Sequence, residues 1–360
     1  MPSNKIVKAV DPKTYVYYIP LSKRPPTRGF RDLLEEYSYV HADDIDTHLN
    51  TIRDLAYTRH PLPSIGLFTF ATLTLCGDDL PVSQNPVYYR YLTREVYPRI
   101  LRELVPGGGR KYLDIGVGGG GWAPDLRRLV WDGAEVGRCW VLGGLIGEGD
   151  EERGVDGERR VRGGDSREWG WGLWGDEDII DGERFVRGWL TDKWDGGETG
   201  EEEGSRDGLE WLRERGLLGE IDIINFVEGL DNCGWEEQIR MCERIITILK
   251  KERGSLVVGR CAGHRNGMRS EKIGIGWKKE KSKGKEKGRA VEKEEVEKEV
   301  VWEHNEESFT EMWKEAGRRT SSEWSVNTAF WRWGVNTKTG EPGWFRGEDN
   351  GVVSFVCERL

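Results

Sequence analysis

The stretch that decides the fold is YLDIGVGGGG at residues 112–121. Its first four residues favour a short buried strand, because apolar residues surround a single acid, Asp114. The glycines that follow predict a loop that opens a helix over residues 124–131. Glycine has no Cβ, so the backbone can approach a ligand, and a helix N-terminus offers unpaired N–H groups. The pattern therefore predicts a site for a nucleotide-like ligand that involves Asp114, Gly116 and Gly118.

The position of the acid separates this loop from two other nucleotide-binding loops. A dinucleotide-binding loop reads G-x-G-x-x-G with its acid about 20 residues later, and a P-loop ends in G-K-[S/T]. Here Asp114 precedes the glycines, and no Lys-Ser/Thr pair follows them. An acid before the glycines is the arrangement that holds S-adenosylmethionine, with the carboxylate near the methionine end and the glycines under the ribose. A dinucleotide-dependent oxidoreductase is the weaker alternative.

Outward from this loop, apolar strands alternate with amphipathic helices. We expect strands at 111–115, 139–145, 184–190, 221–226 and 255–259, with helices at 124–131 and 235–250. Strands separated by helices pair in parallel, so the predicted fold class is α/β, with a Rossmann-like sheet. After a helix that starts at Asn305, strands at 323–330 and 352–358 close the chain. No helix separates them, so we expect an antiparallel pair.

The first 105 residues predict a helical cap. One helix begins near Ile45 and carries Leu49 and Ile52 on the same face, and a second helix runs over 85–104. Each helix has an apolar face and therefore needs a partner surface. We expect two parts: a helical N-terminal cap at 1–105 and an α/β domain at 106–360.

Composition argues against several functional classes. The 360 residues carry 54 Lys and Arg against 64 Asp and Glu, a net charge of −10, which argues against a duplex nucleic-acid binder. The most apolar window, residues 65–76, has 12 residues including three threonines, short of the ~18–20 that cross a membrane. The six cysteines form no C-x-x-C pair, so we expect free thiols and a cytoplasmic location. Cys261-x-x-His264 has poor spacing for zinc, and no metal is expected.

Two segments interrupt the alternation. Residues 147–215 are an irregular stretch rich in Gly and Trp, of which the chain has 49 and 17. Because Gly is nearly twice as frequent as usual, glycines 119–121 carry less weight as ligand-binding residues. Residues 274–299 are mostly Lys and Glu, with almost nothing to bury. We expect a charged flexible loop there, with an exposed helix as the alternative and RNA binding as a minor one.

Several segments, in order and spacing, resemble a known family. They are LEEYS at 34–38, IRDLA at 52–56, HPLPSIGLFTF at 60–70, LDIG at 113–116, DLRRL at 125–129, DGA at 132–134, DII at 222–224, WEEQI at 235–239, GSLVVGR at 254–260 and HNEESFTEMW at 304–313. With these segments the chain resembles the class I S-adenosylmethionine-dependent methyltransferases, specifically the fungal group that methylates meroterpenoid intermediates. The resemblance covers most of the chain. It implies S-adenosylmethionine as the cofactor.

The resemblance also implies two cofactor acids that this sequence lacks. Gly144 and Leu145 stand where the second strand normally ends in an acid that chelates the ribose hydroxyls. Gly188 and Trp189 stand at the end of the third strand, where an Asp near the adenine amine is normal. Losing a carboxylate–ribose contact costs about 1.5–3 kcal/mol. The alternative is that Glu148 or Asp150 takes the place of the ribose acid if the loop folds back. For the adenine position, the nearest acid in the sequence is Asp192.

The resemblance implies O-methylation of a small-molecule carboxylic acid. Methyl transfer from a sulfonium is an in-line displacement, and an acid acceptor is already ionised at neutral pH. Arg260, expected at a strand end on the carboxyl edge, could pair with a substrate acid or form a surface ion pair. A phenol acceptor would need a base, for which His264 or His304 are candidates; His304 could equally be a helix-cap neighbour.

Two functional interpretations follow. The first is a small-molecule methyltransferase of secondary (meroterpenoid or polyketide-type) metabolism, with an acid or phenol substrate, no nucleic acid or membrane partner, and a homodimer as a possible assembly. The second, supported by Leu145 and Trp189, is a catalytically impaired methyltransferase-like protein that serves as a binding or structural partner.

Overall fold

The computed structural model describes most of the chain outside the Gly- and Trp-rich stretch. The described residues are 13, 18–59, 63–78, 83–116, 123–143, 185–187, 208–231, 233–273, 280–286, 289–295, 298–332 and 349–360.

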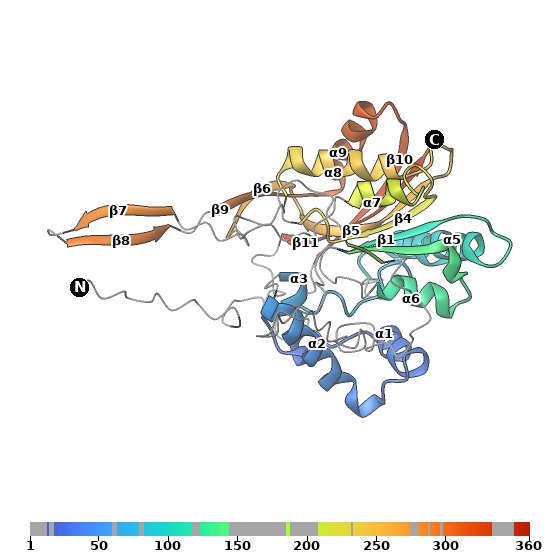
Figure 1. Ribbon diagram of the computed structural model, residues 1–360, viewed down its shortest axis with the longest axis horizontal. Helices are drawn as coiled ribbons and strands as arrows, with labels where there is room; N and C mark the ends of the chain where they lie inside the picture. Colours follow the sequence, from blue (N-terminus) through green and yellow to red (C-terminus); the bar gives the residue numbers. More distant parts are fainter. Residues whose placement is uncertain are drawn as a thin grey trace, which may run out of the picture.

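A seven-stranded mixed sheet forms the centre of the molecule (Figure 1), with the strand order β10-β11-β5-β4-β1-β2-β3. The strands are β1 (Tyr112–Gly116), β2 (Cys139–Gly143), β3 (Phe185–Arg187), β4 (Ile223–Val227), β5 (Leu256–His264), β10 (Trp324–Arg332) and β11 (Asn350–Arg359). Strands β1 to β5 pair in parallel, whereas β11 is antiparallel to both β5 and β10. This confirms the predicted Rossmann-like class I sheet and its terminal antiparallel pair.

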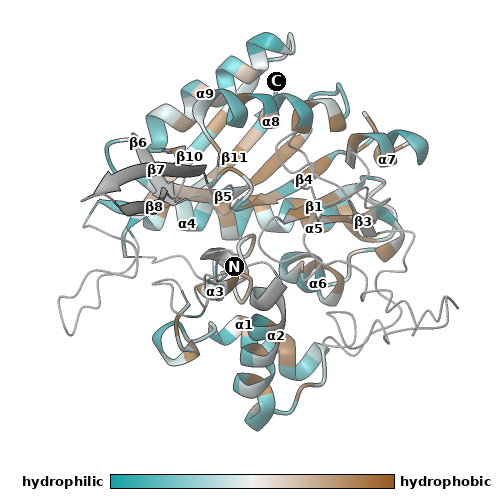
Figure 2. Ribbon diagram, turned by 60° about the vertical axis from the view of Figure 1, so that its left-hand side comes forward, coloured by the Kyte–Doolittle hydropathy of each residue, from teal (hydrophilic) through white to brown (hydrophobic). Residues whose placement is uncertain are grey.

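Helices cover both faces of the sheet, because alternate strand residues point to opposite sides. Helices α7 (Gly208–Glu214), α8 (Trp235–Ile248) and α9 (Glu306–Arg319) share one apolar core with Leu113, Ile224 and Val257. On the other face lie α4 (Pro86–Tyr91), α5 (Tyr97–Leu104) and α6 (Pro124–Trp131), packed on Tyr112 and Ile223. Figure 2 shows the apolar strands between helices whose outer surfaces are hydrophilic.

The N-terminal region is helical, as predicted. It contains α1 (Arg28–Asp32), α2 (Ile45–Arg59) and α3 (Pro63–Gly66), with single turns at Leu21–Lys23, Leu33–Tyr37 and Ala42–Asp44. The predicted stripe Ile45, Leu49 and Ile52 lies in a separate apolar core that spans residues 19–73. The predicted helix over 85–104 is α4 and α5 joined by a π-helical segment at Leu92–Val96, and it packs on the sheet. The boundary at 105/106 stays a prediction.

The prediction of a flexible loop over 274–299 is wrong for most of that segment. Strand β6 (Met268–Ile273) pairs with β9 (Lys298–Glu303), and β7 (Glu280–Glu286) pairs with β8 (Arg289–Glu295), both antiparallel. The β7–β8 hairpin projects from the body of the molecule in Figure 1. Its register sets Lys281 opposite Glu294 and Lys283 opposite Glu292. This pairing is a matter of strand register, which a count of apolar residues alone does not reveal. The prediction of an irregular stretch over 147–215 is also wrong in part, because residues 208–214 form helix α7.

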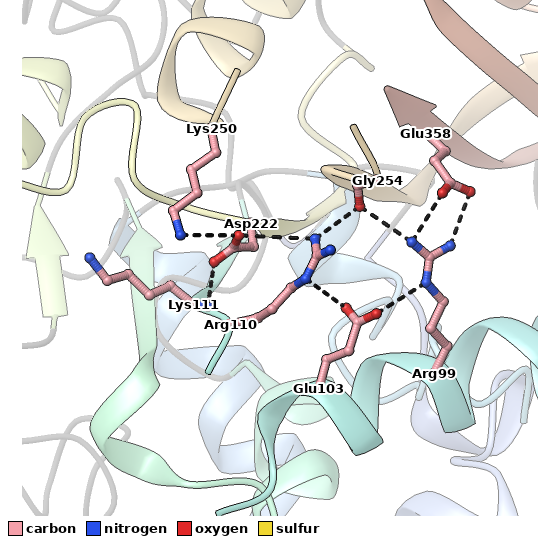
Figure 3. A network of polar contacts seen from close by, with 8 residues as sticks. All are labelled: Arg99, Glu103, Arg110, Lys111, Asp222, Lys250, Gly254 and Glu358. Atoms are coloured by element: carbon pink, nitrogen blue, oxygen red, sulfur yellow. Dashed lines mark hydrogen bonds and ion pairs between the residues drawn. The ribbon is translucent and has the colours of Figure 1, made fainter. Parts of the chain in front are cut away.

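The amino edge of the sheet is held by a charged network (Figure 3). Asp222, just before β4, is buried and accepts a hydrogen bond from the Lys111 backbone N–H at 2.8 Å, next to the Lys250 ammonium at 3.3 Å. Gly254 has a φ of +86°, a conformation that favours glycine, and its carbonyl accepts hydrogen bonds from Arg99 and Arg110. These contacts hold the amino ends of the strands together, so the charged groups at this edge serve the fold. The ligand site is therefore sought at the opposite, carboxyl edge of the sheet.

Candidate functional site

The candidate site lies where the strand order changes direction. Strand β1 is flanked by β2 on one side and by β4 on the other, so the chain crosses in opposite directions from this point. In open α/β sheets, ligands bind in the crevice at the carboxyl ends of the strands at such a switch point. Asp114 of β1 and Asn225 of β4 stand directly opposite each other in the parallel register.

Asp114 is a buried carboxylate with neutral donors. Its side chain is only 4% exposed, and Oδ2 accepts hydrogen bonds from the Tyr112 hydroxyl and the Asn225 amide, each at 3.0 Å. Burial disfavours the charged form and raises the pKa of Asp114 to about 6, although both hydrogen bonds oppose this shift. The site therefore holds a carboxylate that a ligand cation would stabilise.

A second buried carboxylate, Asp125, lies beside the first. It belongs to the first turn of α6, which follows the glycine segment (residues 116–121) in the chain, and is 2% exposed. The Asn225 amide nitrogen is 3.4 Å from Asp125 Oδ2, while Asp125 Oδ1 accepts a hydrogen bond from the Leu75 backbone N–H at 2.8 Å. Leu75 belongs to the predicted cap, so β1, β4, α6 and the cap all meet here.

Arg260 joins the sheet to the cap and is not on the surface. The predicted strand end is wrong: β5 continues to His264, and Arg260 is 3% exposed. Its Nη2 donates hydrogen bonds to Glu228 Oε1 (3.1 Å), the Thr72 hydroxyl (2.7 Å) and the Thr69 carbonyl (3.1 Å). The alternative of a surface ion pair is therefore also wrong, because this ion pair is buried. Glu228 engages the guanidinium that was expected to bind a substrate acid.

Sequence reasoning missed Glu228. It follows β4 with a φ of +60°, accepts a hydrogen bond from the Thr69 hydroxyl, and donates its backbone N–H to the Arg260 carbonyl at 2.9 Å. An acid two residues beyond the strand predicted at 221–226 was the available signal. Two of the three threonines in the apolar window at 65–76 are explained here, since Thr69 and Thr72 supply polar contacts to this buried pair.

His304 is buried away from solvent, with both ring nitrogens engaged. Nε2 lies 2.7 Å from Gln238 Oε1, which can only accept, so Nε2 carries the proton, and Nδ1 lies 3.1 Å from the Ser308 hydroxyl. Burial lowers the pKa of His304 to about 3. This placement supports the helix-cap neighbour interpretation, because Asn305 and Ser308 form the capping box of α9. It does not support a role in substrate binding or as a base.

The remaining predicted cofactor residues follow the strand ends. Gly116 is the last residue of β1 and pairs with Gly143, the last residue of β2. Gly118, Gly144, Leu145, Gly188 and Trp189 lie outside the described residues, and their roles stay predictions.

All six cysteines are free thiols. Within the described ranges, no group of three or more His, Cys, Asp or Glu residues is arranged to hold a metal ion, and no helix is long and apolar enough to cross a membrane.

The cap region has a direct counterpart among known proteins. Residues 17–71 match the family model described as the meroterpenoid methyltransferase N-terminal domain. Over 104 residues the chain is 38% identical to the asnovolin E/chermesin D methyltransferase nvfJ of Aspergillus novofumigatus, covering 29% of this chain and 30% of nvfJ. The resemblance predicted from the sequence is confirmed.

Longer alignments extend the similarity into the α/β part. The chain is 26% identical over 303 residues to O-methyltransferase atr3 of Stereocaulon alpinum, covering 84% of this chain and 64% of atr3. It is 23% identical over 298 residues to O-methyltransferase phiE of a fungal species, covering 82% of this chain and 73% of phiE. The aligned parts thus span about a third of the length of nvfJ and just under two thirds of that of atr3.

The raised pKa of Asp114 predicts how the Asp114→Asn variant will differ from the wild type in stability. The folded pKa is about 6 against an ordinary value of 3.8, so the folded state holds the proton more tightly than the unfolded state. The stability from this proton is complete below the ordinary pKa and is lost as pH rises through about 6. Asparagine stays neutral, so only the wild type loses this stability as pH rises. The free energy of unfolding of the variant minus that of wild type should therefore be about 2–3 kcal/mol larger at pH 7.5 than at pH 4. Urea unfolding at both pH values measures this gain, and an equal difference at both would contradict it.

Proposed function

We propose that this chain is an S-adenosylmethionine-dependent methyltransferase acting on a small molecule of secondary metabolism, of the meroterpenoid or polyketide type. One juxtaposition carries the proposal: Asp114 is buried at the switch point of the sheet, and the same edge of the sheet is hydrogen-bonded to a cap whose residues 17–71 match the meroterpenoid methyltransferase N-terminal domain. The Asp125–Leu75 and Glu228–Thr69 hydrogen bonds join the two features at one edge of the sheet.

Two observations support S-adenosylmethionine as the ligand of this edge. Asp114 is a buried carboxylate with neutral hydrogen-bond donors, so the positively charged ammonium end of the cofactor would favour its ionised form. Asn225 Oδ1 is buried without a hydrogen-bond partner among the described residues, and it can accept an N–H. Asp114 would hold the ammonium, and Gly116 with the glycines after it would lie under the ribose. The bound cofactor supplies an electrophilic methyl group.

The reaction that we propose is O-methylation of a carboxylic acid. Two relatives, atr3 and phiE, are named O-methyltransferases, which supports oxygen as the acceptor atom. A carboxylate is ionised at neutral pH, so the protein's task is to align the acceptor with the methyl group and exclude water. The cap over the carboxyl edge suits this task, because it is fixed to the sheet by the buried contacts of Arg260 and Glu228.

Binding of the cofactor tests the proposed role of Asp114. Wild-type chain should bind S-adenosylmethionine or its demethylated product with micromolar affinity in calorimetric titration. Asp114→Asn keeps the shape of the side chain but removes the charge, and should weaken binding at least about ten-fold, as expected for loss of a charge-assisted contact. Asp222→Asn, a buried acid at the amino edge, is the matched control and should change affinity less than about two-fold.

The same titration separates the alternative function. A chain that melts cooperatively but gives no heat up to millimolar cofactor would identify the site as impaired, as the replacement of two cofactor acids by Leu145 and Trp189 suggests. The protein would then be a methyltransferase-like binding partner. Equal affinities of wild type and Asp114→Asn would instead reject Asp114 as the partner of the ammonium.

Transfer of a labelled methyl group tests the acceptor class. Wild-type chain should move the label from S-adenosylmethionine to aryl or terpenoid carboxylic acids, giving a base-labile methyl ester detected by mass spectrometry. The corresponding methyl esters, which lack the free acid, should stay unlabelled. Phenols without a carboxylic acid are the second control set; label on these alone would contradict the proposed acceptor.

A further inference from the structure

Asn225 occupies a position that the proposed function does not by itself explain. It lies in the middle of β4, is 1% exposed, and its side chain faces the same side of the sheet as α6. Its single amide nitrogen lies 3.0 Å from Asp114 Oδ2 and 3.4 Å from Asp125 Oδ2. These two carboxylates stand at opposite ends of the glycine segment, Asp114 within β1 before it and Asp125 in α6 after it.

We propose that Asn225 is a positioning residue whose amide nitrogen bridges Asp114 and Asp125, a contact that we call the clasp. The clasp orients the Asp114 carboxylate toward the cofactor. The inference rests on the proposed function for its cofactor part, whereas the clasp itself is independent of it. Through Asp125 Oδ1 and the Leu75 N–H, the same contacts extend to the cap. One side chain thus sets the spacing of the cofactor strand, the following helix and the cap.

The chemistry of the amide suits this task better than that of any charged side chain. An NH₂ group has two N–H bonds, so each carboxylate can receive one. The amide orientation is fixed by its neighbours, because the reverse orientation would turn Oδ1 toward two carboxylate oxygens. A lysine or arginine would add a positive charge that competes with the cofactor's cation, and an aspartate would place three acids together. The neutral amide holds both acids without adding a positive charge beside Asp114.

The contact also opposes part of the effect of burial on Asp114. The hydrogen bonds from Asn225 and Tyr112 lower the pKa of Asp114, against the larger effect of burial. Without Asn225, the ionised form loses one of its two donors, while the second carboxylate, Asp125, stays close by. The carboxyl group would then stay protonated to higher pH, and a protonated acid cannot pair with a cation.

Hydrogen exchange in the ligand-free chain tests the clasp. Asn225→Ala should speed exchange in peptides that cover the start of α6, residues 123–131, by at least about ten-fold, since the opening free energy there falls by one or two hydrogen bonds. Asp222→Ala is the matched control, because it lies three residues earlier and ties β4 to β1 at their amino ends through Lys111. It should leave exchange over 123–131 unchanged. Equal exchange in wild type and Asn225→Ala, or the same increase in both variants, would overturn the clasp.

Titration with S-adenosylmethionine as a function of pH tests the aiming of Asp114. Asn225→Ala should bind about ten-fold more weakly at pH 7, and the pH below which affinity falls should shift upward by about one unit relative to wild type. A residue needed only for folding would lower stability without moving this pH. An unmoved profile would overturn the positioning role, and so would an affinity equal to wild type.

A second variant and a separate readout keep the outcomes distinct. Asn225→Ser retains one hydroxyl donor that can serve only one carboxylate, so it should fold where alanine fails and give intermediate exchange and affinity. If wild-type chain binds no S-adenosylmethionine, the proposed function and the aiming role both fail. The exchange experiment still decides the clasp in that case, because it uses no ligand.

Discussion

Burial of the Asp114 carboxylate at the carboxyl end of β1 is the constraint on which the rest of the site depends. An ionised carboxylate removed from water is costly unless donors or a cation accompany it. Tyr112 and Asn225 supply two neutral donors, which leaves a pKa of about 6. At neutral pH the group is therefore mostly charged and only partly compensated. Such a group favours binding of a positively charged ligand.

The cap is attached to this edge by polar contacts as well as by apolar packing. The Leu75 N–H reaches Asp125, and Thr69 and Thr72 reach the buried Glu228–Arg260 pair. Hydrogen bonds in a buried place are directional, so they fix the position of the cap more sharply than apolar contact does. Arg260 is therefore a residue that fixes the cap, and its predicted role in binding a substrate acid stays a prediction.

The sequence predicted local features well and long-range pairings poorly. The strand predicted at 111–115, which is β1 (Tyr112–Gly116), the helix from Pro124 and the stripe on α2 follow from periodicity and from glycine and proline signals between near neighbours in the chain. Glu228 with Thr69, and Asn225 with Asp114, join residues more than 100 positions apart, which no local pattern encodes. The β7–β8 hairpin was missed for a related reason, since the register that pairs its two strands cannot be derived from a count of apolar residues.

Proton release on cofactor binding tests the central claim most directly. If the cofactor's cation pairs with Asp114, binding at pH 6 must expel the proton from the acid molecules that carry one, about half of them. Calorimetric titration of S-adenosylmethionine in two buffers of different ionisation enthalpy measures this number. The account predicts release of about half a proton at pH 6, much less at pH 7.5, and none from Asp114 in the Asp114→Asn variant. Binding with the same enthalpy in both buffers at pH 6 would contradict it.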